Sequence, residues 1–246
     1  APCAFKNGPD YIDPMFHRSA LQVDSHNLDL FLSNREMVRA IFARYAAGHG
    51  AAVCEGAMGF YDGQGLTTRA SAWELADTLG LPVLLVVQPR GASLTLAAQI
   101  NGLKQFRTPS HLAGILLNDC APHLYALLAP MLERETGLPV LGYLPHLPGA
   151  ALESRHLGLK TAGEIADLQQ KISRMADALV VDWEKLFALT EWQRLWCTPI
   201  GSSLRKSCRP REQRNSAPAF PLPLQGMRRF ASPTPKRWKH WSGRER

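Results

Sequence analysis

Two aspartates lie three residues apart in FKNGPDYIDPMFH, residues 5–17. A glycine and a proline exclude regular structure just before Asp10, and Pro14 favours an extended backbone at Asp13, so residues 10–13 are predicted to form a loop. Carboxylates on a fixed loop can hold a bound group. The alternative is an ordinary structural turn, because aspartate beside proline and glycine favours turns for backbone reasons alone.

A second carboxylate-bearing segment is VCEGAMGFYDGQG, residues 53–65. The apolar run before it predicts a strand that ends at Cys54 and is followed by Glu55, with Asp62 further along the glycine-rich stretch. Glycines let the backbone approach a bulky or phosphorylated ligand, and a carboxylate at a strand end can reach a metal ion directly or through water. The alternative is a glycine-rich connection with a solvated Glu55.

Short apolar runs and amphipathic stretches alternate along residues 1–196. The apolar runs lack polar alternation, which is typical of strands buried on both faces; they occupy residues 51–54, 82–87, 112–117 and 139–144. Helical patterns occupy residues 28–47, 71–79, 92–106, 122–136, 162–178 and 183–192. Repeated strand-then-helix units predict an α/β fold with a parallel sheet flanked by helices. Ligands of such sheets bind beyond the carboxyl ends of the strands, where both carboxylate segments are expected.

The charge of the chain is unevenly distributed. The net charge is +7, but residues 1–196 carry 16 Lys+Arg against 19 Asp+Glu, whereas residues 197–246 carry 12 against 2. The second segment also contains seven of the 18 prolines and shows no periodicity, which predicts a separate, disordered basic tail. We therefore expect a folded domain over residues 1–190 and a tail over residues 191–246.

The cysteines and the hydropathy pattern bear on the compartment. Five cysteines without a Cys-x-x-Cys pair indicate neither a disulfide framework nor a zinc site, which fits a reducing environment. No apolar run reaches the length of a membrane span, and the first residues do not resemble a signal peptide. The sequence predicts a soluble, cytoplasmic protein without a membrane partner.

Several blocks in order along about residues 4–190 carry a family resemblance: FKNGPDYIDPMFH, NLDLFL, CEGAMGFYDG, GLPVLLVVQPRGASLTLAAQINGL, LAGILLNDC, GLPVLGYLPHLP and ESRHLGL. Together they resemble cobyrinate a,c-diamide synthase, a glutamine-dependent amidoligase of cobalamin biosynthesis. The resemblance implies the P-loop NTPase fold of dethiobiotin synthetase, with Mg²⁺ as cofactor and ATP as co-substrate. It further implies amidation of the a and c carboxylates of cobyrinate or hydrogenobyrinate through acyl phosphates, with ammonia derived from glutamine.

The resemblance also implies roles for matching positions. It implies magnesium binding by Glu55 and Asp10, catalytic roles for Asp10, Asp13 and Asp62, corrin binding by Tyr11 and Ile12, and adenine recognition by Asn118. The alternative for Asn118 is an N-cap of the following helix.

Three further residues remain ambiguous at this point. Lys6 and Arg90 either approach phosphate or are exposed side chains beside strand ends. For His156, which lies in a block shared with the family, we expect a structural role.

Two parts of the family pattern are not matched. The family opens with a strand and a G-x-x-x-x-G-K-[ST] phosphate loop, and this chain is expected to begin after them. Loss of that internal strand predicts unpaired strand edges, weak ATP binding and low stability. The glutamine amidotransferase domain is not visible either, and neither Cys197 nor Cys208 is assigned as its nucleophile. We expect a fragment with impaired activity.

The tail and the substrate leave alternatives open. Synonymous codons can be chosen for residues 224–246 such that another reading frame encodes a helix-patterned string resembling the family, so we hypothesise a frameshift near residues 190–200. Alternative functions are an amidoligase for nickel-sirohydrochlorin, the cobyric acid pathway or dethiobiotin synthesis, a non-catalytic remnant, and a nucleic-acid binder that uses the basic tail with Trp238 and Trp241. Nucleic acid is not the expected partner, and a homodimer is left open.

Overall fold

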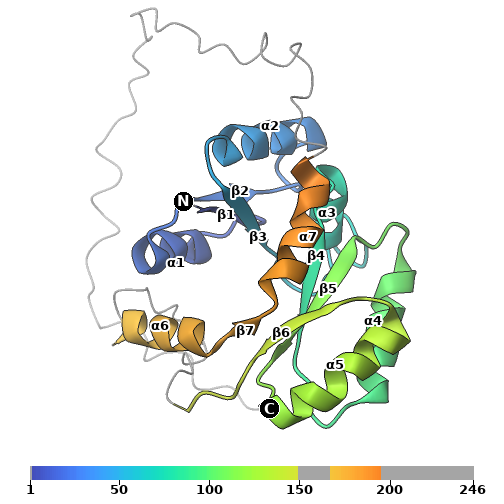
Figure 1. The fold of residues 1–246 in the computed structure, drawn as a ribbon. Helices are drawn as coiled ribbons and strands as arrows, with labels where there is room; N and C mark the ends of the chain where they lie inside the picture. Colours follow the sequence, from blue (N-terminus) through green and yellow to red (C-terminus); the bar gives the residue numbers. More distant parts are fainter. Residues whose placement is uncertain (1, 149–166, 195–246) are drawn as a thin grey trace, which may run out of the picture. The chain divides into compact units, whose positions relative to one another are not determined.

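The strands form two sheets in the computed structural model, which describes residues 2–148 and 167–194 (Figure 1). In the first sheet, β1 (Pro2–Asn7) lies between β2 (Ser25–Leu28) and β3 (Ala51–Glu55), and both pairings are parallel. In the second sheet, β4 (Val83–Val87), β5 (Leu112–Asn118) and β6 (Val140–Leu144) are parallel, and β7 (Val180–Val181) pairs antiparallel with β6. The predicted α/β class with parallel strands and flanking helices is confirmed.

Helices connect most of the parallel strands. They are α1 (Ile12–Leu21), α2 (Arg35–Ala46), α3 (Ala72–Leu79), α4 (Leu94–Phe106), α5 (Pro122–Thr136), α6 (Leu168–Ala178) and α7 (Trp183–Arg194). Helix α5 has the predicted bounds, because Pro122 suits the first turn and Gly137 ends the helix in the left-handed region. Helices α4 and α5 lie side by side (Figure 1) and pack on the second sheet through Ile100 and Leu132.

The helix predicted over residues 28–47 begins too early. Leu28 ends β2, and α2 starts only at Arg35, because the Asn34 side chain accepts the N–H of Met37 and caps the helix there. Strand β2, helix α1 and strand β7 were not predicted. The other predicted helices are present, although residues 162–166 of the sixth lie outside the described part of the chain.

Strands β3 and β4 differ from the expectation of burial on both faces. Each stands at the edge of its sheet, and Val53 and Val86 are 61% and 56% exposed. The expectation holds better for the central strand β5, in which Ile115 and Leu117 are fully buried. Every open sheet has edge strands, so the edges at β3 and β4 leave the predicted loss of an internal strand a prediction.

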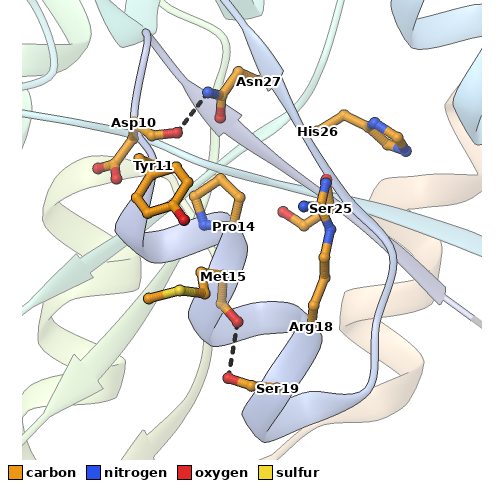
Figure 2. A pocket seen from close by; sticks show the side chains of 9 residues that line it. All are labelled: Asp10, Tyr11, Pro14, Met15, Arg18, Ser19, Ser25, His26 and Asn27. Carbon is orange, nitrogen blue, oxygen red and sulfur yellow. Dashed lines mark hydrogen bonds between the residues drawn. The ribbon is translucent and has the colours of Figure 1, made fainter. Parts of the chain in front are cut away.

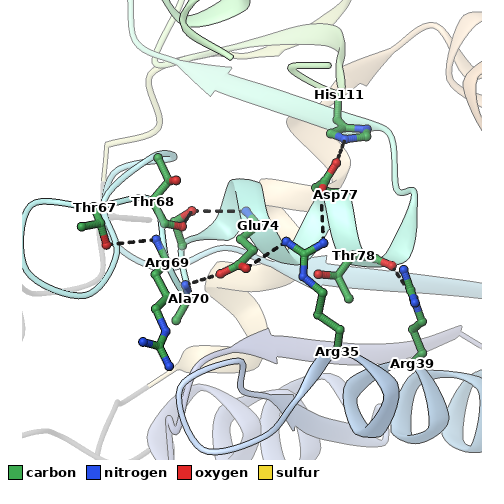
Figure 3. Close-up of polar contacts among 11 residues, drawn as sticks. Arg35, Arg39, Thr67, Thr68, Arg69, Ala70, Glu74, Asp77, Thr78 and His111 are labelled. Atoms are coloured by element: carbon green, nitrogen blue, oxygen red, sulfur yellow. Dashed lines mark hydrogen bonds and ion pairs between the residues drawn. The ribbon is translucent and has the colours of Figure 1, made fainter. Parts of the chain in front are cut away.

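A polar network joins α2 to α3 (Figure 3). The Arg35 guanidinium donates to Glu74 Oε1 at 2.9 Å and to Asp77 Oδ2 at 3.4 Å. Glu74 also accepts the N–H of Ala70 through its carboxylate and donates its own N–H to Oγ of Ser71, the N-cap of α3. The network fixes the connection that leaves the Glu55 strand.

Several sequence predictions fall beyond this description. Helix α7 continues to Arg194, four residues past the expected domain boundary at residue 190. Residues 195–246, with Cys197, Cys208, Trp238 and Trp241, lie outside the described residues, and so does His156. In the part of the chain that the structure covers, no helix has the length and apolar character needed to cross a membrane.

Candidate active site

A buried lysine joins the two carboxylate segments. Lys6 lies near the end of β1 in register with Glu55 of β3, so the parallel pairing brings both to the same edge of the sheet. Lys6 Nζ lies 2.7 Å from Asp13 Oδ2 and 3.1 Å from Glu55 Oε1, and it donates to the backbone oxygen of Gly56 at 3.0 Å. Only 4% of Lys6 is exposed, so the exposed-lysine alternative is wrong. We call Lys6, Asp13, Glu55 and His17 the Lys6 cluster.

The environment of Lys6 favours its charged form. Burial on its own lowers the pKa of a lysine, but the hydrogen bonds and charges of Asp13 and Glu55 outweigh that effect. The pKa of Lys6 is therefore raised above its ordinary value, and the side chain is a permanent cation at neutral pH. A buried, fixed cation at a strand end can bind an anionic group of a ligand or hold carboxylates in place.

His17 is the member of the cluster that sequence reasoning missed. Its Nε2 lies 3.0 Å from Glu55 Oε2, and its Nδ1 lies 2.9 Å from the hydroxyl of the fully buried Ser25. The spacing of four residues between Asp13 and His17 places both on one face of α1. That signal was hidden because residues 10–13 were predicted to form a loop.

Helix α1 begins at Ile12, which corrects the loop prediction for Ile12 and Asp13, whereas Asp10 and Tyr11 precede the helix. Asp10 Oδ1 accepts the N–H groups of Ile12 at 2.8 Å and Asp13 at 3.1 Å, which satisfies two donors of the first turn. Pro14 does not prevent this, because the N–H groups of a first turn have no partner within the helix. The predicted extended backbone at Asp13 is wrong for the same reason.

A pocket of about 460 Å³ opens beside this helix start (Figure 2). The Asn27 side chain donates to the backbone oxygen of Asp10 at 2.5 Å and connects β2 to the helix start. Tyr11 is exposed at the pocket, whereas Ile12 is not among its lining residues. The lining residues are Asp10, Tyr11, Pro14, Met15, Arg18, Ser19, Ser25, His26 and Asn27.

Asp62 lies apart from the Lys6 cluster in the loop between β3 and α3. Its N–H donates to the Gly59 oxygen at 2.9 Å, and its carboxylate lies over the Cα of Gly59. Within residues 2–148 and 167–194, no hydrogen bond or ion pair joins Asp62 to the cluster. The structure thus brings together Asp13 and Glu55, but not Asp62.

The strand ends of the second sheet carry a separate polar group. Asn118 is the last residue of β5, and the N-cap of α5 is Ala121, so the N-cap alternative for Asn118 is wrong. The neighbouring Asp119 accepts from the Gln88 side chain and lies 2.7 Å from His146 Nδ1. The hydrogen bond from His146 lowers the pKa of Asp119, and the charge of Arg90 acts in the same direction. We call Gln88, Asp119 and His146 the Asp119 cluster.

The carboxylates of the Lys6 cluster are of the ligand type that a hard cation such as Mg²⁺ prefers. Mg²⁺ prefers oxygen ligands, keeps several waters and is often held by only one or two carboxylates. Glu55 has a 47% exposed side chain, so its carboxylate is within reach of a ligand. Among the residues that the structure describes, no three His, Cys, Asp or Glu side chains are grouped as a metal site, and Lys6 holds Asp13 and Glu55.

Comparison with known proteins shows one consistent similarity. The chain is 42% identical over 187 residues to the cobyrinate a,c-diamide synthase of Clostridium tetani, which covers 75% of this chain and 42% of that protein. The chain is a homologue of the cobyrinate a,c-diamide synthases. The proteins of this name from Clostridium acetobutylicum and Thermoplasma acidophilum are 41% and 37% identical, over 71% and 74% of the chain and 40% and 41% of theirs. The resemblance seen in the sequence is thereby confirmed.

The chain spans about two fifths of the length of these curated relatives. No protein-family model matches the chain. Among solved structures, a ParA family ATPase from Chlorobium tepidum is 15% identical to the chain with a TM-score of 0.37, over 61% of this chain and 72% of that one.

Proposed function

We propose that this chain is the part of a cobyrinate a,c-diamide synthase that binds the corrin and activates its carboxylates for amidation. The observation that carries the proposal is the Lys6 cluster, in which a buried cation holds Asp13 and Glu55 at one sheet edge. The similarity to the named synthases supports the choice of substrate.

The proposed reaction proceeds in two steps. A side-chain carboxylate of cobyrinate or hydrogenobyrinate attacks the γ-phosphorus of ATP, and ADP leaves, which turns a poor electrophile into an acyl phosphate. Ammonia derived from glutamine then attacks the carbonyl carbon, loses a proton and expels phosphate, which leaves the amide. The same sequence at the a and c positions gives the diamide of cobalamin biosynthesis, and we place it in the cytoplasm.

The residues of the chain bind and orient the reactants. Lys6 offers a fixed positive charge to anionic oxygens, and His17 orients Glu55 through its bond to that carboxylate. Asp10 and Glu55 would hold Mg²⁺, which supplies charge neutralisation for phosphate oxygens. We further propose catalytic roles for Asp10, Asp13 and Asp62, corrin binding by Tyr11 and Ile12, and adenine recognition by Asn118.

The test is equilibrium dialysis of the 246-residue chain against cobyrinate, read by corrin absorbance. We expect saturable binding of cobyrinate, weaker binding of nickel-sirohydrochlorin and cobyric acid, and no displacement of bound cobyrinate by the colourless diamino acid precursor of dethiobiotin. Lys6→Met should weaken cobyrinate binding about tenfold, because Asp13 and Glu55 lose the cation that holds them in place.

The matched control is Lys185→Met. Lys185 is also paired with an acid, Glu133 at 3.0 Å, but it lies on α7 outside the site. Its replacement should leave corrin binding unchanged. Absence of cobyrinate binding, or tighter binding of one of the other acids, would contradict the proposed function.

A further inference from the structure

The pocket beside α1 contains a cation that the proposed reaction does not use. Arg18 lies in the last turn of α1, and one of its guanidinium nitrogens donates to the backbone oxygen of Ser25 (Figure 2). Among the residues that the structure describes, no carboxylate forms an ion pair with Arg18. An arginine has five N–H donors in a planar fork, so most of them remain available to a ligand.

His26 is the other basic residue of the pocket, and it is uncharged at neutral pH. His26 also lines the pocket, and its ring stacks on Tyr45 with centroids 3.6 Å apart. Burial, followed by the charge of Arg18, lowers the pKa of His26, so the imidazole is neutral at neutral pH. Arg18 is therefore the charged basic group of this pocket.

The negative end of the pocket lies at the opposite end of the same helix. Asp10 precedes α1, and Arg18 lies six residues, or about 9 Å along the helix axis, beyond Ile12. Between them, Tyr11 and Met15 line the pocket with apolar surface. A flat macrocycle with acids around its rim can cover this apolar surface and place one of its rim acids near Arg18.

We propose that Arg18 binds a second peripheral carboxylate of the corrin while a different carboxylate is being activated. The inference rests on the proposed function and deepens it, because it names a specificity-determining residue. Arg18 forms charge-assisted hydrogen bonds with a carboxylate but not with the corresponding amide. The pocket thus prefers corrins whose rim acids are still ionised, and it releases amidated product more readily.

The experiment compares two ligands and three variants in the same dialysis assay. The ligands are cobyrinate and its peripheral methyl ester, which lacks the negative charges. We expect Arg18→Met to bind cobyrinate about tenfold more weakly and the ester with unchanged affinity, with Arg18→Lys in between because it keeps the charge without the fork.

Arg134→Met is the control, since Arg134 is an exposed arginine in the last turn of α5. It should bind both ligands as the unaltered chain does. Equal affinity of Arg18→Met and the unaltered chain for cobyrinate overturns the inference, and so does an equal loss for both ligands, which indicates a structural role.

Two further outcomes separate the possible failures. If the unaltered chain does not bind cobyrinate at all, the proposed function fails together with the inference; if it binds and Arg18→Met binds equally well, the inference alone fails. Should Arg18→Met not fold, as judged by circular dichroism, the unaltered chain is compared with a corrin whose acids are all amides except one. We expect that monoacid to bind about tenfold more weakly than cobyrinate, and equal affinity overturns the inference.

Discussion

The Lys6 cluster and the Asp119 cluster occupy equivalent places but differ in burial. Both lie at the carboxyl ends of parallel strands, and both join side chains of neighbouring strands. In the first, a lysine that is 4% exposed holds two carboxylates, whereas in the second the His146 side chain is 75% exposed. The same kind of strand-end position thus gives a charged group held away from water in one sheet and a solvated contact in the other.

Removal of the buried cation is expected to have the largest effect on stability. Lys6→Met keeps the apolar stem but leaves Asp13 and Glu55 without their positive partner, and we expect a loss of about 3 kcal/mol in the free energy of unfolding. Urea denaturation followed by circular dichroism measures it.

The control for stability is again Lys185→Met. Lys185 pairs with Glu133 and Asp182 at the surface, where such pairs contribute about 0–1 kcal/mol. Equal losses for the two lysine variants would show that burial does not distinguish the Lys6 cluster from a surface ion pair.

The cysteine beside each cluster extends the comparison to pH. Burial, with a smaller effect of Cys3, raises the pKa of Cys54 to about 12 from 9.0. A folded-state pKa above the unfolded value means that the stabilisation is complete below pH 9 and is lost as pH rises toward 12. The stability of the chain should fall by up to about 1.4 kcal/mol per pH unit in this window from Cys54 alone.

Cys54→Ala should reduce that slope, as measured by urea denaturation at about pH 8 and about pH 10.5. Cys120, which follows Asp119, is the counterpart in the second sheet, and its pKa is also raised by burial. A slope unchanged by Cys54→Ala would mean that Cys54 reaches solvent as a thiolate in the folded protein.

The smallest effect is expected at His146. Because the hydrogen bond from His146 lowers the pKa of Asp119, His146→Ala should raise that pKa toward its usual range. The contribution of Asp119 to stability is present above its unfolded pKa and is lost as pH falls through the lowered folded value, so the variant should lose it at a higher pH. An NMR titration of the Asp119 carboxyl carbon measures the shift. An unchanged titration would show that the contact with His146 does not affect the ionisation of Asp119.

The sequence predicted the elements whose signals are local. The apolar run at residues 112–117 and the proline and glycine that flank Pro122–Thr136 predicted β5 and α5 correctly. Helix α1 was missed because Pro14 was taken as a barrier to helix at Asp13, although a first turn tolerates proline. The restricted backbone of a proline can be recognised from the sequence, but its position within a helix cannot, and that position decides whether the proline is tolerated.

The site was predictable in part. The sequence placed Asp13 and Glu55 at one sheet edge, and the register of β1 with β3 confirms that placement for Glu55 beside Lys6. The burial of Lys6 could not be inferred, because it depends on α1 packing over the strand end. His17 was missed for the same reason, since its partner Ser25 lies on a strand that the pattern did not show.

The carboxylate of Asp10 has a consequence for how ligand binding can be observed. Its Oδ1 accepts the amide protons of Ile12 and Asp13, so any group that draws this oxygen away also loosens the first turn of α1. These two amides therefore act as built-in reporters. Their hydrogen-exchange rates record, from the backbone, whether the Asp10 carboxylate has been drawn toward a ligand.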